Sequence, residues 1–186
     1  MTNVFHFEKR DWLPSKKLYL LRAGFQGVEN KLDQNMMHLT NEIYLEAISL
    51  VQPQLFYQTV SVQKVLNISI PRQFEGISDV TFFVSTLGES IKKRAEAYSL
   101  SEETTKGAML DAWASESLEA LNDRFDNHLR HTHNKGTMRF SPGYADIPLS
   151  ENKKIIDFLR CPIVQAHPKS GMLIPQKSTV CMIGWY

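Results

Sequence analysis

Residues 139–144 have the sequence RFSPGY and combine side chains that could bind a small charged molecule. Arg139 carries a permanent cation whose planar fork suits a carboxylate or a phosphate. Pro142 and Gly143 predict a type II turn, because proline presets φ at the first central position and glycine accepts a positive φ at the second. Tyr144 adds an aromatic face and a hydroxyl. Two interpretations are open, a site for a zwitterionic ligand with an attached ring and an ordinary surface loop.

A long helix is expected before this motif, over residues 102–130. Its apolar stripe consists of Leu110, Ala114, Ser117, Leu121 and Phe125. A second stripe is acidic, with spacings of three and four, and consists of Glu116, Glu119, Asp123 and Asp126. A solvated helix face explains such a stripe, and the alternative is that one carboxylate turns inward toward a ligand.

The elements that must position these residues are predicted to include both helices and strands, which do not alternate strictly as in βαβ units. The expected helices cover residues 31–51, 102–130 and 151–159, and the expected strands cover residues 55–62, 80–84, 172–174 and 179–185. Thr86 with Glu89, and Ser99 with Glu102, are predicted to form capping boxes at helix starts. A chain of 186 residues is expected to form a single domain, residues 1–186. The predicted fold class is α+β, a curved and mainly antiparallel sheet with flanking helices.

Composition narrows the classes of function. A net charge of +1 without any lysine- or arginine-rich run gives no electrostatic footprint for nucleic acid. No stretch approaches the length of a membrane span, and the N-terminus lacks the apolar core of a signal peptide. Cys161 and Cys181 are expected to be buried thiols in a reducing cytosol, so the protein is predicted to be cytoplasmic. His128, His131 and His133 match no familiar metal-site spacing and are interpreted as a polar helix end.

Conventional catalytic motifs are absent from the sequence. It contains no G-x-S-x-G elbow, no P-loop and no G-x-G-x-x-G after a strand. If the protein takes part in chemistry, it is therefore expected to hold a reactive small molecule for a partner.

Four segments together resemble the activation domain of cobalamin-dependent methionine synthase and its stand-alone relatives. The sequence Arg-x-Ser-Pro-Gly-Tyr, followed by an acidic residue and Pro-Leu, is similar to the signature of that domain. The other three are residues 86–88, which resemble a corner after a strand, residues 111–119, which resemble the long helix, and residues 172–178 with 183–186, which together resemble the closing segment. The matches follow the order of the family over residues 80–186 and are looser before residue 80.

The resemblance implies a binding site for S-adenosylmethionine. Its residues would be Arg139, Ser141, Pro142, Gly143, Tyr144, Asp11 and Glu119. Arg139 would pair with the ligand carboxylate, and Glu119 stands at the recurrent glutamate of the family's long helix. Asp11 lies in an Asp-Trp-x-Pro sequence whose acidic residue is the family's candidate for the ligand ammonium. The alternative for that segment is the start of a helix or strand anchored by Trp12.

The resemblance also implies an accessory function. The family's domain presents the methyl group of S-adenosylmethionine to an oxidised corrinoid, which an electron donor such as flavodoxin reduces. The sequence contains no homocysteine, folate or corrinoid domain, so cobalamin is expected only on a partner, a corrinoid-binding protein or a split methionine synthase. The protein is therefore expected to be an activation subunit, an accessory part of a methyltransferase, and whether it is itself an enzyme stays open. The alternative is a non-catalytic S-adenosylmethionine sensor or docking protein for a corrinoid protein.

Overall fold

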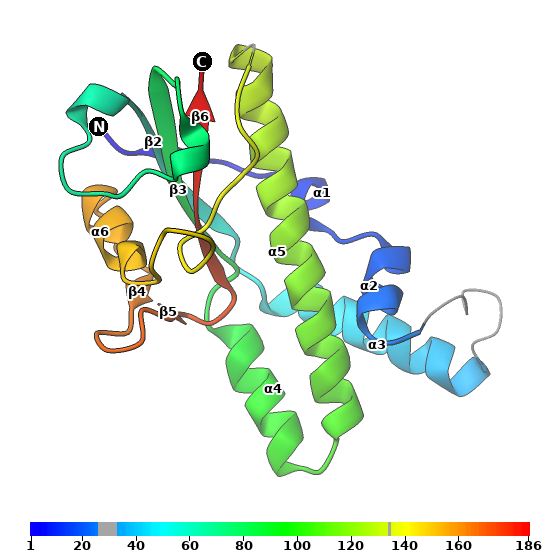
Figure 1. The fold of residues 1–186 in the computed structure, drawn as a ribbon. Coiled ribbons are helices and arrows are strands. Elements are labelled where there is room, and N and C mark those ends of the chain that lie inside the picture. The colour runs from blue at the N-terminus through cyan, green and yellow to red at the C-terminus, as the bar shows by residue number, and fades with distance from the viewer. Residues whose placement is uncertain (26–32, 134) are drawn as a thin grey trace.

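A four-stranded antiparallel sheet forms the centre of the computed structural model, which describes residues 1–25, 33–133 and 135–186 (Figure 1). The strands are β1 (Asn3–Phe5), β2 (Gln54–Ser61), β3 (Asp79–Thr86) and β6 (Ser178–Trp185), in the order β1-β2-β3-β6. Two further short strands, β4 (Gln165–Ala166) and β5 (Leu173–Ile174), pair with each other. The predicted α+β class with a mainly antiparallel sheet is confirmed.

Six α-helices accompany the sheet in the part of the chain that the structure describes. They are α1 (Lys9–Trp12), α2 (Lys16–Arg22), α3 (Gln34–Leu50), α4 (Ser90–Leu100), α5 (Thr104–Thr132) and α6 (Glu151–Phe158). Short 3₁₀ turns cover Val62–Lys64 and Arg72–Phe74. The helices predicted over residues 102–130 and 151–159 correspond to α5 and α6. Measured over these described segments, no helix combines the length and the apolar character that a membrane crossing requires.

The starts of the helices differ in detail from the prediction. Residues 31 and 32 lie outside the described residues, and α3 is capped by Asp33, whose carboxylate accepts a hydrogen bond from the Met36 amide at 2.8 Å. Both predicted capping boxes are wrong. Thr86 is the last residue of β3, where it pairs with Ser178 of β6. Ser99 lies inside α4. In both cases tertiary pairing or helix continuation outweighs a local side-chain cap.

Both faces of the sheet are buried, which explains the unbroken apolar run over residues 80–84. On one face, Phe83 and Ile183 pack with Trp113 and Phe125 of α5. The opposite face forms a second core, made of Val80, Phe82, Val84, Val180 and Met182 with α6 and the loops around it. Alternate residues of β3 and β6 therefore serve two different cores.

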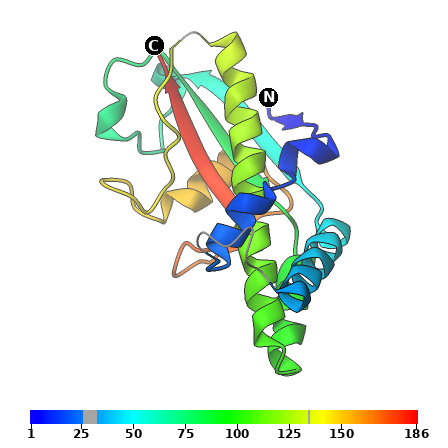
Figure 2. The same ribbon diagram turned by 90° about the vertical axis from the view of Figure 1, so that its right-hand side faces the viewer.

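The helix α5 runs along one face of the sheet, and α6 lies on the other (Figures 1 and 2). The predicted apolar stripe of α5 is confirmed, because Leu110, Ala114, Ser117, Leu121 and Phe125 are all buried. In Figure 1, α4 and the first half of α5 form a hairpin that projects beyond the sheet. The second half of α5 therefore lies beside the sheet, and its acidic stripe reaches the segment that follows the helix.

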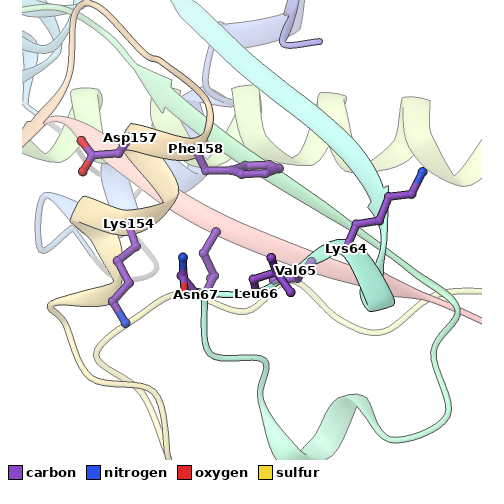
Figure 3. A pocket seen from close by; sticks show the side chains of 8 residues that line it. Lys64, Val65, Leu66, Asn67, Lys154, Asp157 and Phe158 are labelled. Atoms are coloured by element: carbon purple, nitrogen blue, oxygen red, sulfur yellow. The ribbon is translucent and has the colours of Figure 1, made fainter.

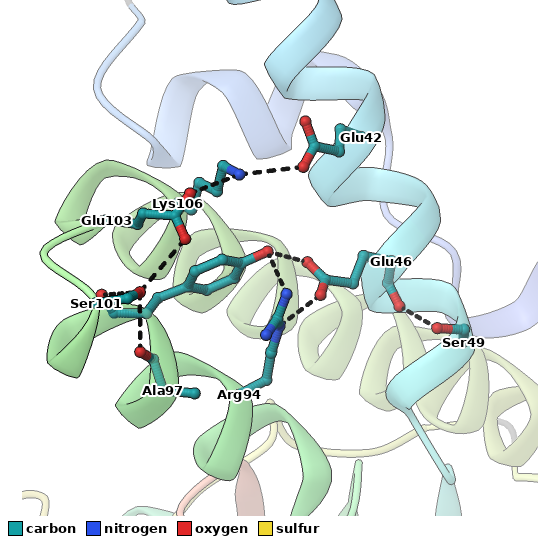
Figure 4. A network of polar contacts seen from close by, with 9 residues as sticks. Glu42, Glu46, Ser49, Arg94, Ala97, Ser101, Glu103 and Lys106 are labelled. Atoms are coloured by element: carbon teal, nitrogen blue, oxygen red, sulfur yellow. Dashed lines mark hydrogen bonds and ion pairs between the residues drawn. The ribbon is translucent and has the colours of Figure 1, made fainter.

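A polar network ties the projecting hairpin to α3 (Figure 4). Glu46 of α3 accepts hydrogen bonds from Arg94 Nε at 2.5 Å and from the hydroxyl of Tyr98. Lys106 of α5 reaches Glu42 of α3 at 3.3 Å. Three helices are thus joined at one end of the molecule, which fixes the direction in which α5 runs toward the candidate site.

Candidate functional site

The segment after α5 is built onto the free edge of β6. Backbone hydrogen bonds join Phe140 and Met182 in both directions, at 2.9 and 2.8 Å, and Thr137 donates to the Gly184 carbonyl at 2.9 Å. Because side chains alternate along extended backbone, Phe140 enters the core on the α6 side while Arg139 points back toward α5. The backbone that carries Arg139 is therefore fixed by the sheet.

Arg139 lies between two carboxylates of α5. Its Nη2 donates to Asp123 Oδ1 at 2.7 Å and to Glu119 Oε2 at 3.3 Å. The Arg139 side chain is 21% exposed, whereas those of Glu119 and Asp123 are 53% and 64% exposed. The Nη1 atom of Arg139 is buried and has no hydrogen-bond partner among the described residues. The cluster thus combines one guanidinium with two carboxylates and carries a net charge of −1.

The acidic stripe of α5 is not simply a solvated face. At its N-terminal end Glu116 pairs with Arg22 of α2, and at its C-terminal end Asp126 pairs with Arg130 Nε at 2.8 Å. Glu119 and Asp123, between them, share Arg139. The structure therefore brings Glu119 to Arg139, as the predicted site requires, and adds Asp123, which was predicted only as a member of the stripe.

The loop after Arg139 turns at Gly143, as predicted. Gly143 has a φ of +97°, and its amide donates to the Ile147 carbonyl at 2.8 Å. Ile147 and Pro142 are buried, so the loop is anchored at both ends of the turn. Tyr144 is 69% exposed and stands at the surface beside the turn. Its aromatic face is accessible from solvent.

Ser141 lies under the loop in contact with a buried thiol. Its Oγ is 3.1 Å from Cys181 Sγ on β6. Burial raises the pKa of the Cys181 thiol to about 11, although the Ser141 hydrogen bond and the charge of Arg139 lower it in part. The thiol is therefore protonated at neutral pH and unsuited to act as a nucleophile. Cys161 and Cys181 are both free and buried, which confirms that they are buried thiols.

A groove runs from the loop toward the β4–β5 hairpin. It has a volume of about 310 Å³. Its walls mix apolar side chains with short polar ones, namely Ser141, Pro142, Leu149, Asn152, Met172, Leu173, Gln176, Ser178, Thr179 and Val180. Ser141 and Pro142, which closely follow Arg139 in the chain, border the groove, whereas Arg139, Glu119 and Asp123 do not line it.

Asp11 lies elsewhere. Its carboxylate accepts a hydrogen bond from the Glu8 amide at 2.9 Å and pairs with Arg124 Nε of α5 at 2.9 Å. Both ribbon views show α1, in dark blue, on the side of α5 away from the yellow loop after Arg139 (Figures 1 and 2). Trp12 is 8% exposed and packs against Trp113, as expected for an anchoring tryptophan. The structure does not bring Asp11 together with Arg139, and its role as an ammonium ligand stays a prediction.

A second cavity carries less chemistry than the groove. A cavity of about 480 Å³ lies between α6 and the turn near Val65 (Figure 3). Its Asp157 is paired with Lys153, its Lys154 is paired with Glu151, and Lys64 and Lys154 lie on opposite sides of the hollow. No group of at least three His, Cys, Asp or Glu side chains within the described ranges is arranged to hold a metal ion. The polar groups of this cavity do not converge on one point.

Comparison with known proteins shows which known fold this chain resembles. No protein-family model matches the sequence, and no curated protein matches it. Among solved structures, the crystal structure of the MetH reactivation domain bound to AdoHcy is similar, with a TM-score of 0.72 and 12% sequence identity. The match covers 100% of this chain and 78% of that chain. The chain has the fold of the MetH reactivation domain.

This similarity confirms the resemblance to the methionine synthase activation domain at the level of the fold. The sequence could identify Arg139, Glu119 and Gly143 as candidates because they stand in short local motifs. It missed the contact of Asp123 with Arg139. The available signal was the spacing of four residues from Glu119, which places both carboxylates on one helix face.

Proposed function

We propose that this protein binds S-adenosylmethionine at the Arg139 site and serves as an activation subunit for a corrinoid-dependent methyltransferase. The observation that carries the proposal is the cluster of Arg139 with Glu119 and Asp123 beside the Gly143 turn. The fold supports it, since the similar MetH reactivation domain was crystallised with AdoHcy.

The cluster suits the amino-acid end of the ligand. An α-carboxylate pairs well with a guanidinium, and an α-ammonium requires a carboxylate, which Glu119 supplies next to Arg139. S-adenosylmethionine carries one carboxylate, one ammonium and one sulfonium, so its net charge is +1. The cluster carries −1, and the two charges are therefore complementary.

The other end of the ligand would occupy the groove behind the loop. An adenosine needs an apolar wall with a few polar groups, and the groove offers Pro142, Leu149 and Met172 together with Ser141 and Gln176. Tyr144 is exposed beside the turn, where its ring could face the sulfonium cation. The site would thus hold the ligand at both ends and leave the methyl group toward solvent and a partner.

The chemistry would be supplied by the ligand and the partner. S-adenosylmethionine provides a methyl group whose bond to sulfur breaks with both electrons left on sulfur, while reduced cobalt on the partner provides the pair for the new bond. A one-electron donor of the flavodoxin type would reduce the cobalt beforehand. Residues of this chain would only bind and orient the ligand, which is the contribution expected of a positioning domain. We place the protein in the cytoplasm, where two free thiols stay reduced.

Titration calorimetry with S-adenosylmethionine tests the binding step. Replacing Arg139 with alanine should weaken binding about tenfold to a hundredfold, because a charge-assisted contact is lost. The matched control is Arg160→Ala, which removes an exposed arginine just beyond α6 that lines a different hollow together with Phe56 and Pro162. The control should bind as the wild type does. Wild-type affinity in Arg139→Ala would contradict the assignment of the site.

A spectroscopic assay tests the activation step. The protein is added to a corrinoid-binding protein with S-adenosylmethionine and a reductant, and the absorbance change from cob(II)alamin to methylcobalamin is followed. We expect faster methylation with the protein than without it. If S-adenosylmethionine binds but methylation is not accelerated with any native corrinoid protein, the sensor or docking function replaces the activation function.

A further inference from the structure

The two carboxylates that share Arg139 are not equivalent. Both reach the same atom, Nη2, but Asp123 Oδ1 lies at 2.7 Å and Glu119 Oε2 at 3.3 Å. The shorter distance is typical of a strong charge-assisted hydrogen bond, and the longer one exceeds that range. Asp123 is therefore the principal holder of the guanidinium, and Glu119 is the weaker partner.

The other terminal nitrogen of the Arg139 guanidinium, Nη1, is bonded to neither carboxylate. Nη1 is buried and lacks a hydrogen-bond partner among the residues that the structure describes. Leaving a buried donor unpaired is unfavourable, so a small rotation that brings Nη1 to an acceptor would be stabilising. The backbone of Arg139 is fixed by the pairing of Phe140 with Met182, which leaves the side chain as the part that can rotate.

We propose that Asp123 is a positioning residue that keeps its hydrogen bond to Arg139 when the ligand binds. Glu119 releases Arg139 at that point and binds the ammonium of the ligand instead. This inference rests on the proposed function, because it describes how the same site would accept an amino-acid group. Asp123 would act through Arg139, by orienting the guanidinium toward the ligand carboxylate. Glu119 would contact the ligand directly.

The two roles predict different couplings with Arg139. The probe is S-adenosylhomocysteine, and the measured quantity is its Kd by calorimetry in Asp123→Asn, Glu119→Gln, Arg139→Ala and the two double variants. Asp123→Asn alone should weaken binding about two- to fivefold, as expected for a partly exposed ion pair. In the Arg139→Ala background the same change should have no further effect, since the residue it acts through is gone. Glu119→Gln should still weaken binding in that background.

Asp126→Asn is the matched control. It is the same substitution on the same helix face, but Asp126 is paired with Arg130 instead of Arg139. It should leave the Kd unchanged. 5′-Methylthioadenosine, which lacks both the carboxylate and the ammonium, should bind equally to wild type and Asp123→Asn.

A measurement without ligand separates this inference from the proposed function. Hindered rotation of the Arg139 guanidinium can be followed by nitrogen-15 NMR of its Nη signals. The restriction should be lost in Asp123→Asn and kept in Glu119→Gln. Equal loss in both variants, or an Asp123→Asn effect on Kd that persists in Arg139→Ala, would overturn the positioning role. Failure of the wild-type protein to bind any of these ligands would instead overturn the proposed function, and the exchange of Glu119 with it.

Discussion

Gly143 holds the loop of the candidate site in a conformation that side chains avoid. Its φ is +97°, and an added Cβ would lie 3.0 Å from Leu149 Cδ1. We expect Gly143→Ala to distort the loop, to lower the free energy of unfolding by about 1–2 kcal/mol and to weaken S-adenosylmethionine binding at least about tenfold. Calorimetry and urea unfolding measure the two effects.

Gly107→Ala serves as the control for this change. Gly107 lies in α5, where an added Cβ would meet its nearest neighbours at an ordinary 3.5 Å. The variant should keep wild-type affinity and gain about 0.5–1 kcal/mol in stability, because alanine favours a helix. If Gly143→Ala also bound normally, the loop would not be part of the ligand site.

Glu151 makes the stability of the α6 side dependent on pH. Burial raises the pKa of this carboxyl, but hydrogen bonds from Lys154 and from the Ser69 amide outweigh it and hold the pKa below its usual range. A lowered pKa means that the stabilisation is present above about pH 4.3, the unfolded value, and is lost as the pH falls through the folded pKa. Glu151→Gln should therefore cost about 1–2 kcal/mol at pH 7. In urea unfolding near pH 3 its difference from wild type should be much smaller, and an equal difference at both pH values would contradict this account.

At the scale of residues, the sequence predicted the local motif of the candidate site but not the contacts between residues that are distant in the chain. Arg139 and Gly143 belong to one hexapeptide, whose turn chemistry acts within a few bonds. The Asp123 contact joins residues 16 positions apart and depends on how α5 packs beside β6. Asp11 also lies in a local motif, but its role could not be predicted from that motif. The partner of its carboxylate is Arg124, and this pairing depends on how α1 packs against α5.

At the scale of elements, residues 136–140 lie along the free edge of β6 and form two isolated bridges with it, Gly136 with Trp185 and Phe140 with Met182. Gly136 lies so close to Trp185 that an added Cβ would be 2.4 Å from two atoms of the indole ring. Gly136→Ala should push this segment away from β6 and displace Arg139. We expect about tenfold weaker ligand binding, consistent with the loss of a well-oriented charged contact, although Gly136 itself would not touch the ligand. Calorimetry measures the affinity, and tryptophan fluorescence should report the moved indole. Unchanged binding would show that Arg139 is positioned independently of this segment.

Long elements were predictable, whereas most of the short ones were not. The predicted strands over residues 80–84 and 179–185 fall inside β3 and β6, because an apolar run bounded by turns carries its own signal. The elements β1, α1 and α2 contain only three to seven residues each. Their limits follow from contacts such as the hydrogen bond from Ser117 to the Trp12 carbonyl, which a local pattern does not encode.

For the whole molecule, ligand binding should appear as thermal stabilisation. A ligand present at one hundred times its Kd stabilises the folded state by about 2.7 kcal/mol. For a chain of 186 residues this corresponds to a rise in Tm of about 5–10 °C. S-adenosylmethionine should produce this shift in the wild type and little of it in Arg139→Ala at the same concentration. An equal shift in both proteins would place the binding site elsewhere.

The topology of the sheet also sets the order in which the site can be assembled during synthesis. β3 pairs with β6 across a long stretch of chain, from Asp79 to Trp185. At ribosomal speed the roughly 100 intervening residues take about 5–20 s, whereas a hairpin such as β2–β3 closes in microseconds. The nascent chain therefore exposes one edge of an apolar strand for seconds, a period in which a chaperone would be useful. Because Phe140 needs Met182 as its partner, the Arg139 loop can take its place only after β6 has emerged. Only a chain whose sheet is complete would then be able to bind the ligand.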